Sequence, residues 1–165
     1  MNALEESILF SQTLVGRPYG AWDGDTIGEG KPFYASNAPV PSSLHIPTVS
    51  CAGLANLMRR HARMPVPGVA EQDPYAAWKQ YLLAFLVKFD VSTTYPRGTL
   101  LLREYTNEAD QGHVAIVTGP GTIIHAAPPC VREESLSISH AWCAQGYYQW
   151  ACSPDHWLSR PFDKN

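Results

Sequence analysis

The period of the hydrophobic pattern changes midway along the chain, and this change constrains the fold more than any other feature. Before residue 90, apolar residues recur at helical spacing, as in residues 3–15. Beyond residue 97, they form short apolar or β-branched runs separated by polar, glycine or proline residues, at 98–105, 113–118 and 122–126. Helices followed by antiparallel strands predict an α+β fold, with the N-terminal helices packed on a central sheet.

A helix that begins near Cys51 has one clearly apolar face. The residues of this face follow the spacing i, i+3, i+4 and i+7, namely Leu54, Leu57, Met58 and His61. Three basic residues of the same segment are expected to face water, namely Arg59, Arg60 and Arg63. A further helix is predicted over residues 73–89, with Asp73 as its N-cap and Pro74 in its first turn. Residues 130–138 are compatible with one more strand, and the aromatic-rich segment after them has no clear pattern.

Length and charge exclude several classes of protein. A chain of 165 residues that is 45% hydrophobic can form one ordinary core, so a single domain over residues 1–165 is expected. The net charge of −3 offers no basic surface for nucleic acid. No apolar stretch reaches the roughly 20 residues that a membrane span needs, and the acidic start is unlike an export signal. We therefore expect a cytoplasmic protein, or one exported by a signal-independent route.

The four cysteines favour a reactive thiol over a metal or disulfide framework. No two of them have the C-x-x-C spacing of a zinc or redox motif: Cys51, Cys130, Cys143 and Cys152. If Cys51 is a working thiol, three cysteines remain, and an odd number argues against a fully bridged secreted protein. A reducing compartment is the simpler expectation. Pairing of Cys143 with Cys152 stays open.

The hairpin GHVAIVTGPGTIIHA predicts that two histidines share one face of a sheet. If residues 119–121 form a three-residue loop with Gly121 in the left-handed conformation, Thr118 pairs with Thr122 and Ala115 pairs with His125. Because side chains alternate along a strand, His113 then lies on the same face as His125, about 7–8 Å away at Cα. A two-residue loop would place the two rings on opposite faces.

A cysteine at a helix start and two histidines on one sheet face are the components of a thiol nucleophile. The helix N-terminus and a neighbouring imidazolium both lower the pKa of a thiol, whose reactive form is the thiolate. One histidine, His113, would exchange the proton with Cys51, and the other, His125, would fix its tautomer. A zinc site made from the same three residues is an alternative, although no short-spaced pair of ligands is present to anchor the metal.

The order of these segments resembles that of the NlpC/P60 cysteine hydrolases, papain-like amidases best known for cutting cell-wall peptides. The resemblance covers residues 3–126 and includes GRPYG (16–20), SCAGL (50–54), PRGTL (96–100), GHVAIV (112–117) and IIHA (123–126). It implies Cys51 as nucleophile, His113 as base and His125 as the third polar residue, without a metal or cofactor. It also implies that Tyr19 lies beside the nucleophile, where it helps to bind the substrate or the oxyanion.

The chain departs from the family at positions that concern the substrate. The common form is D-C-S-G, whose acidic residue helps to hold the free amine of an L-alanyl-γ-D-glutamyl substrate; here Ser50 and Ala52 flank the cysteine. A long segment, residues 21–47, separates the tyrosine from the cysteine, and its acidic residues are candidates for the missing anion: Asp23, Asp25 and Glu29. Its proline-rich end could wall the cleft or act as a lid.

The resemblance implies a cysteine amidase or endopeptidase that acts through a thioester on a small peptide or muropeptide, such as one with a γ-D-glutamyl-diaminopimelate bond. A variant of this hypothesis is a delivered antibacterial effector, with an immunity or delivery partner, or a peptide-tailoring hydrolase. A different class is a catalytically silent relative that binds a peptide. Related lipid acyltransferases usually place the histidine before the cysteine, whereas here Cys51 comes first.

Overall fold

The computed structural model describes residues 2–20, 46–64, 74–103, 112–137 and 148–158. Its helices are α1 (Ala3–Thr13), α2 (Cys51–His61), α3 (Pro74–Leu82), the 3₁₀ turn η3 (Leu83–Phe85) and α5 (Pro154–Trp157). Its strands are β1 (Val87–Lys88), β2 (Leu100–Arg103), β3 (His113–Gly119), β4 (Thr122–Ala127), β5 (Cys130–Ser135) and β6 (Trp150–Cys152). No helix in these segments is long and apolar enough to cross a membrane.

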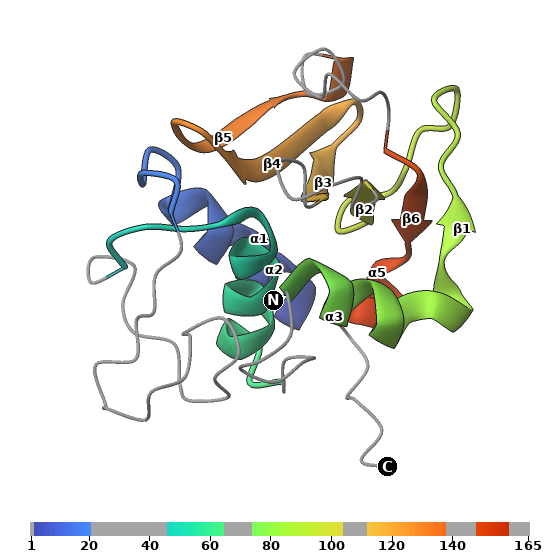
Figure 1. Ribbon diagram of the computed structural model, residues 1–165, viewed down its shortest axis with the longest axis horizontal. Helices are drawn as coiled ribbons and strands as arrows, with labels where there is room; N and C mark the ends of the chain where they lie inside the picture. Colours follow the sequence, from blue (N-terminus) through green and yellow to red (C-terminus); the bar gives the residue numbers. More distant parts are fainter. Residues whose placement is uncertain (1, 21–45, 65–73, 104–111, 138–147, 159–165) are drawn as a thin grey trace.

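The six strands form one antiparallel sheet in the order β1-β6-β2-β3-β4-β5. The helices gather on one side of this sheet, with α2 next to α1 and against β3 and β4 (Figure 1). The predicted α+β class, with N-terminal helices on a central antiparallel sheet, is therefore confirmed.

Strand alternation divides the apolar residues between the two faces of the sheet. Val114 and Ile116 of β3 face the helices and join a large buried cluster with Leu54 and Met58 of α2. The other face carries a smaller cluster that contains Leu101, Ala115, Val117, Ile123, Tyr148 and Ala151. The helices thus cover one face of the sheet. The alternate residues along each strand point to the opposite face.

Two tryptophans hold the helices around the larger cluster. Trp78 of α3 and Trp157 of α5 are fully buried and meet edge to face, with ring centroids 5.7 Å apart. Each indole N–H has an acceptor: that of Trp78 donates to Oδ1 of Asn56, and that of Trp157 donates to the carbonyl of Gly98, both at 2.6 Å. Large apolar rings can therefore be buried here without leaving their polar atoms unsatisfied.

The helix predicted over residues 73–89 is shorter than expected. It ends at Leu82, continues as η3, and turns extended at Leu86, whose ψ is 133°. Residues 87 and 88 form β1 instead, because β6 offers them a partner strand, with Lys88 opposite Trp150. Strand β6 had no clear signal in the sequence, and the predicted N-cap Asp73 lies outside the described residues.

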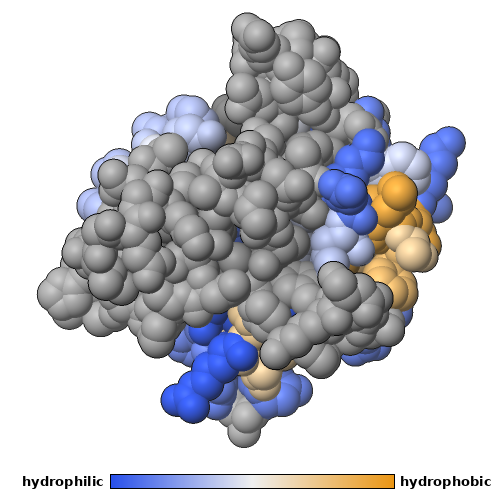
Figure 2. Space-filling model, turned by 60° about the horizontal axis from the view of Figure 1, so that its bottom comes forward, coloured by the Kyte–Doolittle hydropathy of each residue, from blue (hydrophilic) through white to orange (hydrophobic). Residues whose placement is uncertain are grey.

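An apolar surface borders this edge strand. Among the described residues, Leu83, Val87 and Val91 are large hydrophobic side chains that are more than half exposed. Figure 2 shows an apolar patch on one side of the molecule, and Figure 1 places η3 and β1 at that side.

Arg59 is buried, contrary to the expectation that it faces water. Its side chain has no exposed surface, and its Nη1 donates to the carbonyl of Trp157 at 3.0 Å. Burial lowers the pKa of Arg59 to about 10, so it is still charged at neutral pH. Arg60 is also buried, whereas Arg63 is exposed as predicted. The C-terminal turn α5 covers the side of α2 that the helical pattern alone assigns to solvent.

Candidate active site

Helix α2 begins at the candidate nucleophile because the preceding residue acts as its N-cap. Ser50 has an extended backbone, and its Oγ accepts a hydrogen bond from the N–H of Gly53 at 3.1 Å. A Cβ at Gly53 would lie only 2.6 Å from that oxygen, so glycine suits this position. Cys51 is the first helical residue and is half-buried, where the partial positive charge of the helix end favours a thiolate.

The segment that leads to Cys51 runs beside one end of the sheet. Tyr19 forms a parallel bridge with Val49, and its N–H donates to the carbonyl of Pro129 at 2.9 Å. Pro129 lies in the turn between β4 and β5, and the antiparallel register brings the start of β3 to that same end. The segment before Cys51 and the start of β3 therefore lie at the same end of the sheet. Helix α2 packs against β3 and β4 (Figure 1).

The turn between β3 and β4 differs from the prediction by one residue. Gly119 pairs with Thr122, so the loop has two residues, Pro120 and Gly121. Gly121 has a φ of 66°, the left-handed conformation that was expected. Thr118, predicted to pair with Thr122, is instead the extra residue of a β-bulge.

The bulge cancels the effect of the shorter loop on the register. On the side of the bulge away from the turn, Ile116 pairs with Ile124, which is the predicted alignment. His113 and His125 consequently lie on one face of the sheet, as predicted, although the loop that was assumed for that prediction is wrong. Their rings meet at 79°, with centroids 5.1 Å apart.

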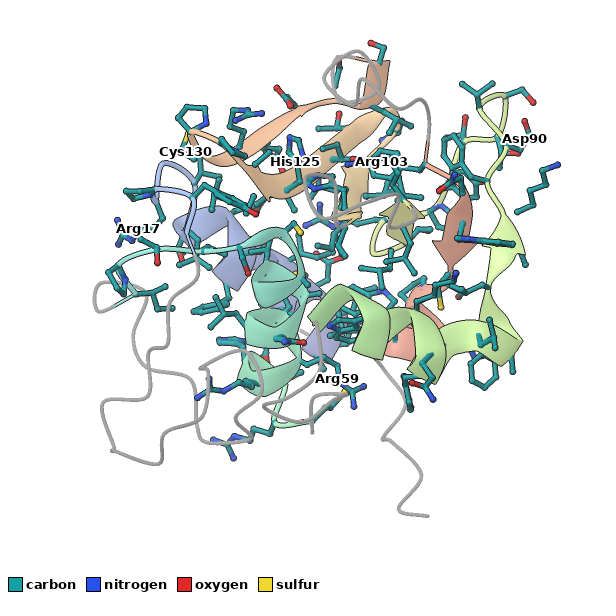
Figure 3. The ribbon with its side chains drawn as sticks, in the orientation of Figure 1. Arg17, Arg59, Asp90, Arg103, His125 and Cys130 are labelled. Carbon is teal, nitrogen blue, oxygen red and sulfur yellow. The ribbon has the colours of Figure 1, made fainter. Side chains whose placement is uncertain are left out.

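Two histidines and a glutamate form a hydrogen-bonded chain across three strands. Nε2 of His113 lies 2.8 Å from Nδ1 of His125, and Nε2 of His125 lies 2.6 Å from Oε1 of Glu134 on β5. Arg132, also on β5, places its Nε 3.5 Å from the other carboxylate oxygen of Glu134. Figure 3 shows His125 above the start of α2, with Arg103 to its right. Glu134 was not among the residues predicted from the sequence.

Burial controls the charge of both histidines. His113 is 2% exposed, and burial is the main cause that lowers its pKa well below its usual value of about 6.5. The positive charges of His125, Arg103 and Arg132 lower it further. The pKa of His125 is also lowered by burial, and Glu134 acts in the opposite direction. At neutral pH the resting His113 is therefore uncharged and able to accept a proton.

The lowered pKa values predict that acid destabilises the protein. Below about pH 6.5 the histidines of the unfolded chain bind protons, whereas the buried pair does not until the pH reaches its lower folded pKa. The free energy of unfolding should therefore fall as the pH drops through this interval. We expect the melting temperature to fall between pH 7.5 and 5, and to fall less in His113→Gln. Equal pH slopes for the two proteins would contradict this.

The structure locates some of the other residues predicted for the site, but not all of them. Tyr19 is 40% exposed and lies next to the segment that precedes Cys51, which suits the position expected for a substrate-binding tyrosine. The side chain of Ser50 is used as a helix cap, a function that the sequence did not suggest. The acidic candidates of the segment 21–47, namely Asp23, Asp25 and Glu29, lie outside the described residues.

Cys152 is a free thiol with no exposed surface, and burial raises its pKa to about 12. Cys143, whose pairing with Cys152 the sequence leaves open, lies outside the described residues. Within the described part of the chain, no group of three histidine, cysteine, aspartate or glutamate residues is arranged to hold a metal ion. The zinc alternative, which needs Cys51, His113 and His125 as joint ligands, therefore has no support in this arrangement.

Solved structures resemble this chain over almost its full length. RipD from Mycobacterium tuberculosis, described as a non-catalytic NlpC/p60 domain protein adapted to peptidoglycan binding, aligns with a TM-score of 0.53 at 15% identity, over 93% of this chain and 98% of that one. The peptidoglycan hydrolase RipB from the same organism aligns with a TM-score of 0.51 at 18% identity, over 92% of this chain and 64% of that one.

A third structure, the NlpC/p60 domain of the peptidoglycan hydrolase SagA, aligns with a TM-score of 0.51 at 20% identity, over 93% of this chain and 99% of that one. No protein-family model and no curated protein matches the sequence. The fold is thus that of an α+β domain in which helices pack on an antiparallel sheet. More narrowly, the chain has the NlpC/P60 fold, which occurs both in peptidoglycan hydrolases and in a non-catalytic peptidoglycan-binding protein.

Proposed function

We propose that the protein is a cysteine amidase or endopeptidase that cuts a short peptide through a thioester intermediate. One observation carries the proposal: His113 and His125 are hydrogen-bonded to each other, and His113 begins β3 at the end of the sheet beside which the segment leading to Cys51 runs. The start of a helix stabilises a thiolate, and a neutral buried imidazole can accept the proton of the thiol.

In the proposed reaction, His113 takes the proton of the Cys51 thiol as the sulfur attacks the carbonyl carbon of the scissile amide. The oxyanion that forms accepts hydrogen bonds from the backbone N–H of Cys51 and the hydroxyl of Tyr19. The C–N bond then breaks, and His113 returns its proton to the leaving amine. Water, deprotonated by His113, finally hydrolyses the thioester to give a carboxylate and the free thiol.

We propose a cell-wall peptide as the substrate, with the γ-D-glutamyl to diaminopimelate bond as the first candidate. The hydrolases RipB and SagA, which share the fold, are both described as acting on peptidoglycan. The fold is also compatible with a delivered effector or a peptide-tailoring enzyme that uses the same chemistry. These variants differ in the peptide that is cut and not in the reacting groups.

A second candidate function is peptide binding without catalysis. The similarity to RipD, a non-catalytic protein with this fold, is the observation that favours it. The presence of a cysteine at the start of α2 and of two hydrogen-bonded histidines favours catalysis instead.

A digestion of defined muropeptides separates the two candidates. The purified protein is incubated with tri- and tetrapeptide stems, with and without the sugar, and the products are identified by mass spectrometry. Two products whose masses add up to that of the substrate plus one water, with a new carboxylate on one and a new amine on the other, support the hydrolase. Binding of the same peptides by calorimetry, without any product, supports the binding protein.

The N-cap offers a separate prediction about the substrate. In Ser50→Asp, the carboxylate caps α2 as well as the hydroxyl does, so the fold should be kept. The added negative charge beside Cys51 should shift preference toward peptides with a free N-terminal amine, by about tenfold in kcat/KM relative to the N-acetylated peptide. Ser50→Asn, which caps without the charge, is the control. An unchanged ratio would mean that the amine is not bound at residue 50.

A further inference from the structure

Glu134 extends the histidine pair beyond the three residues that the sequence indicates. Its Oε1 lies 2.6 Å from Nε2 of His125, whose side chain has no exposed surface, while the carboxylate itself is 17% exposed. The register explains this contact: Glu134 pairs with Ile123 and Arg132 pairs with His125, so both charged side chains of β5 share the face of the histidines.

The hydrogen-bonding capacity of each group determines where the protons are. A carboxylate can only accept, so Nε2 of His125 carries a proton and donates it to Glu134. In the neutral ring, Nδ1 of His125 is then an acceptor, and the 2.8 Å contact requires Nε2 of His113 to donate to it. The remaining nitrogen of His113, Nδ1, is left with a lone pair.

Without an acceptor beyond His125, the pair has a second arrangement of similar quality. Nδ1 of His125 could carry the proton and donate it to Nε2 of His113, and Nδ1 of His113 would then be protonated and unable to act as a base. A carboxylate at position 134 removes this arrangement, because it would leave two acceptors facing each other at 2.6 Å.

We propose that Glu134 is a positioning residue that fixes the tautomers of His125 and His113, so that Nδ1 of His113 accepts the thiol proton of Cys51. The inference rests on the proposed function for its consequence, but the tautomers can be observed without it. Two other charges face the pair, Arg103 on β2 and Arg132 on β5, and both oppose protonation of His113. The negative charge of Glu134 opposes the effects of burial and of Arg132 on the pKa of His125, which helps the pair to hold a proton during the reaction.

The test is ¹⁵N NMR of histidine-labelled protein at pH 7.5, which distinguishes a protonated ring nitrogen from one with a lone pair. Wild type should show a lone pair at Nδ1 of His113 and a proton at Nε2. In Glu134→Gln the amide can either accept or donate, so signals intermediate between the two tautomers are expected. Glu133→Gln is the matched control, because Glu133 precedes Glu134 on the same strand and bonds Gln12 instead.

Kinetics give the second readout, with the substrate found for the wild-type protein. In Glu134→Gln, kcat should fall by about 10- to 100-fold with little change in KM, which is a smaller loss than removal of the base would cause. The acid limb of the pH profile of kcat should also move. Wild-type tautomers in Glu134→Gln would overturn the proposal. If the tautomers change but the wild type cuts no peptide, the position of Glu134 is supported and the proposed hydrolase fails. If hydrolysis is normal in Glu134→Gln, the hydrolase stands and the role of Glu134 fails.

Discussion

Replacing Cys51 with alanine is expected to abolish peptide hydrolysis while leaving the fold intact. The sulfur is the atom that forms the thioester, and no other described thiol is at the start of α2, so we expect kcat to fall by roughly 10⁴-fold or more. The side chain is half-buried and exchanges one small group for another, so the free energy of unfolding should change by no more than about 1 kcal/mol. Product formation by mass spectrometry and thermal unfolding check the two parts.

The matched control is Cys130→Ala. Cys130 is also half-buried and free, and it begins β5 beside Pro18, outside the proposed machinery. This variant should retain wild-type turnover. Full activity in a well-folded Cys51→Ala protein would refute the mechanism, whereas equal losses in both variants would point to a general effect of removing thiols.

The elements that the sequence predicted well are those whose patterns are local. The helix at Cys51 has an apolar face with regular helical spacing, and β3 and β4 are joined by a glycine turn. Strands β1 and β6 were missed because each is only two or three residues long. They exist through pairing with each other and with β2, which is a tertiary interaction that no local pattern encodes.

The candidate site shows the same distinction. The two histidines could be placed on one face from alternation alone, but only by an argument that assumed a three-residue loop. The actual loop is shorter, and a bulge at Thr118 restores the register; a bulge of this kind has no sequence signal strong enough to predict. Glu134 was missed because its position depends on the register of β5 against β4, which the sequence did not define.

Arg59 illustrates how a helical pattern fails when a second layer covers it. The spacing of Leu54 and Met58 correctly identifies the face of α2 that meets the sheet. It cannot reveal that α5, about 100 residues later, packs against another side and offers the carbonyl of Trp157 to the guanidinium. A charged residue on the polar side of a helix is thus buried with a partner rather than solvated.

Replacing His113 with glutamine should remove the reactivity of Cys51. Glutamine retains much of the volume of the ring, which stacks near Tyr148, but it cannot accept a proton from a thiol. We expect kcat/KM to fall roughly 10³-fold, and alkylation of Cys51 by iodoacetamide at pH 7 to slow by at least about tenfold. The rate at each cysteine is followed by peptide mapping from pH 5 to 9, which requires no knowledge of the substrate.

The other cysteines make this measurement self-controlled. Cys152, whose pKa burial raises to about 12, should label slowly at every pH in both proteins, and its labelling would report unfolding. Cys130, half-buried and outside the site, should label at the same rate with or without His113. If Cys51 of the wild type is alkylated rapidly well below pH 8.5, and this rapid alkylation is absent from His113→Gln, the imidazole activates the thiol. If Cys51 labels identically in both proteins, His113 is not its base, and the peptide-binding function becomes the better explanation of the fold.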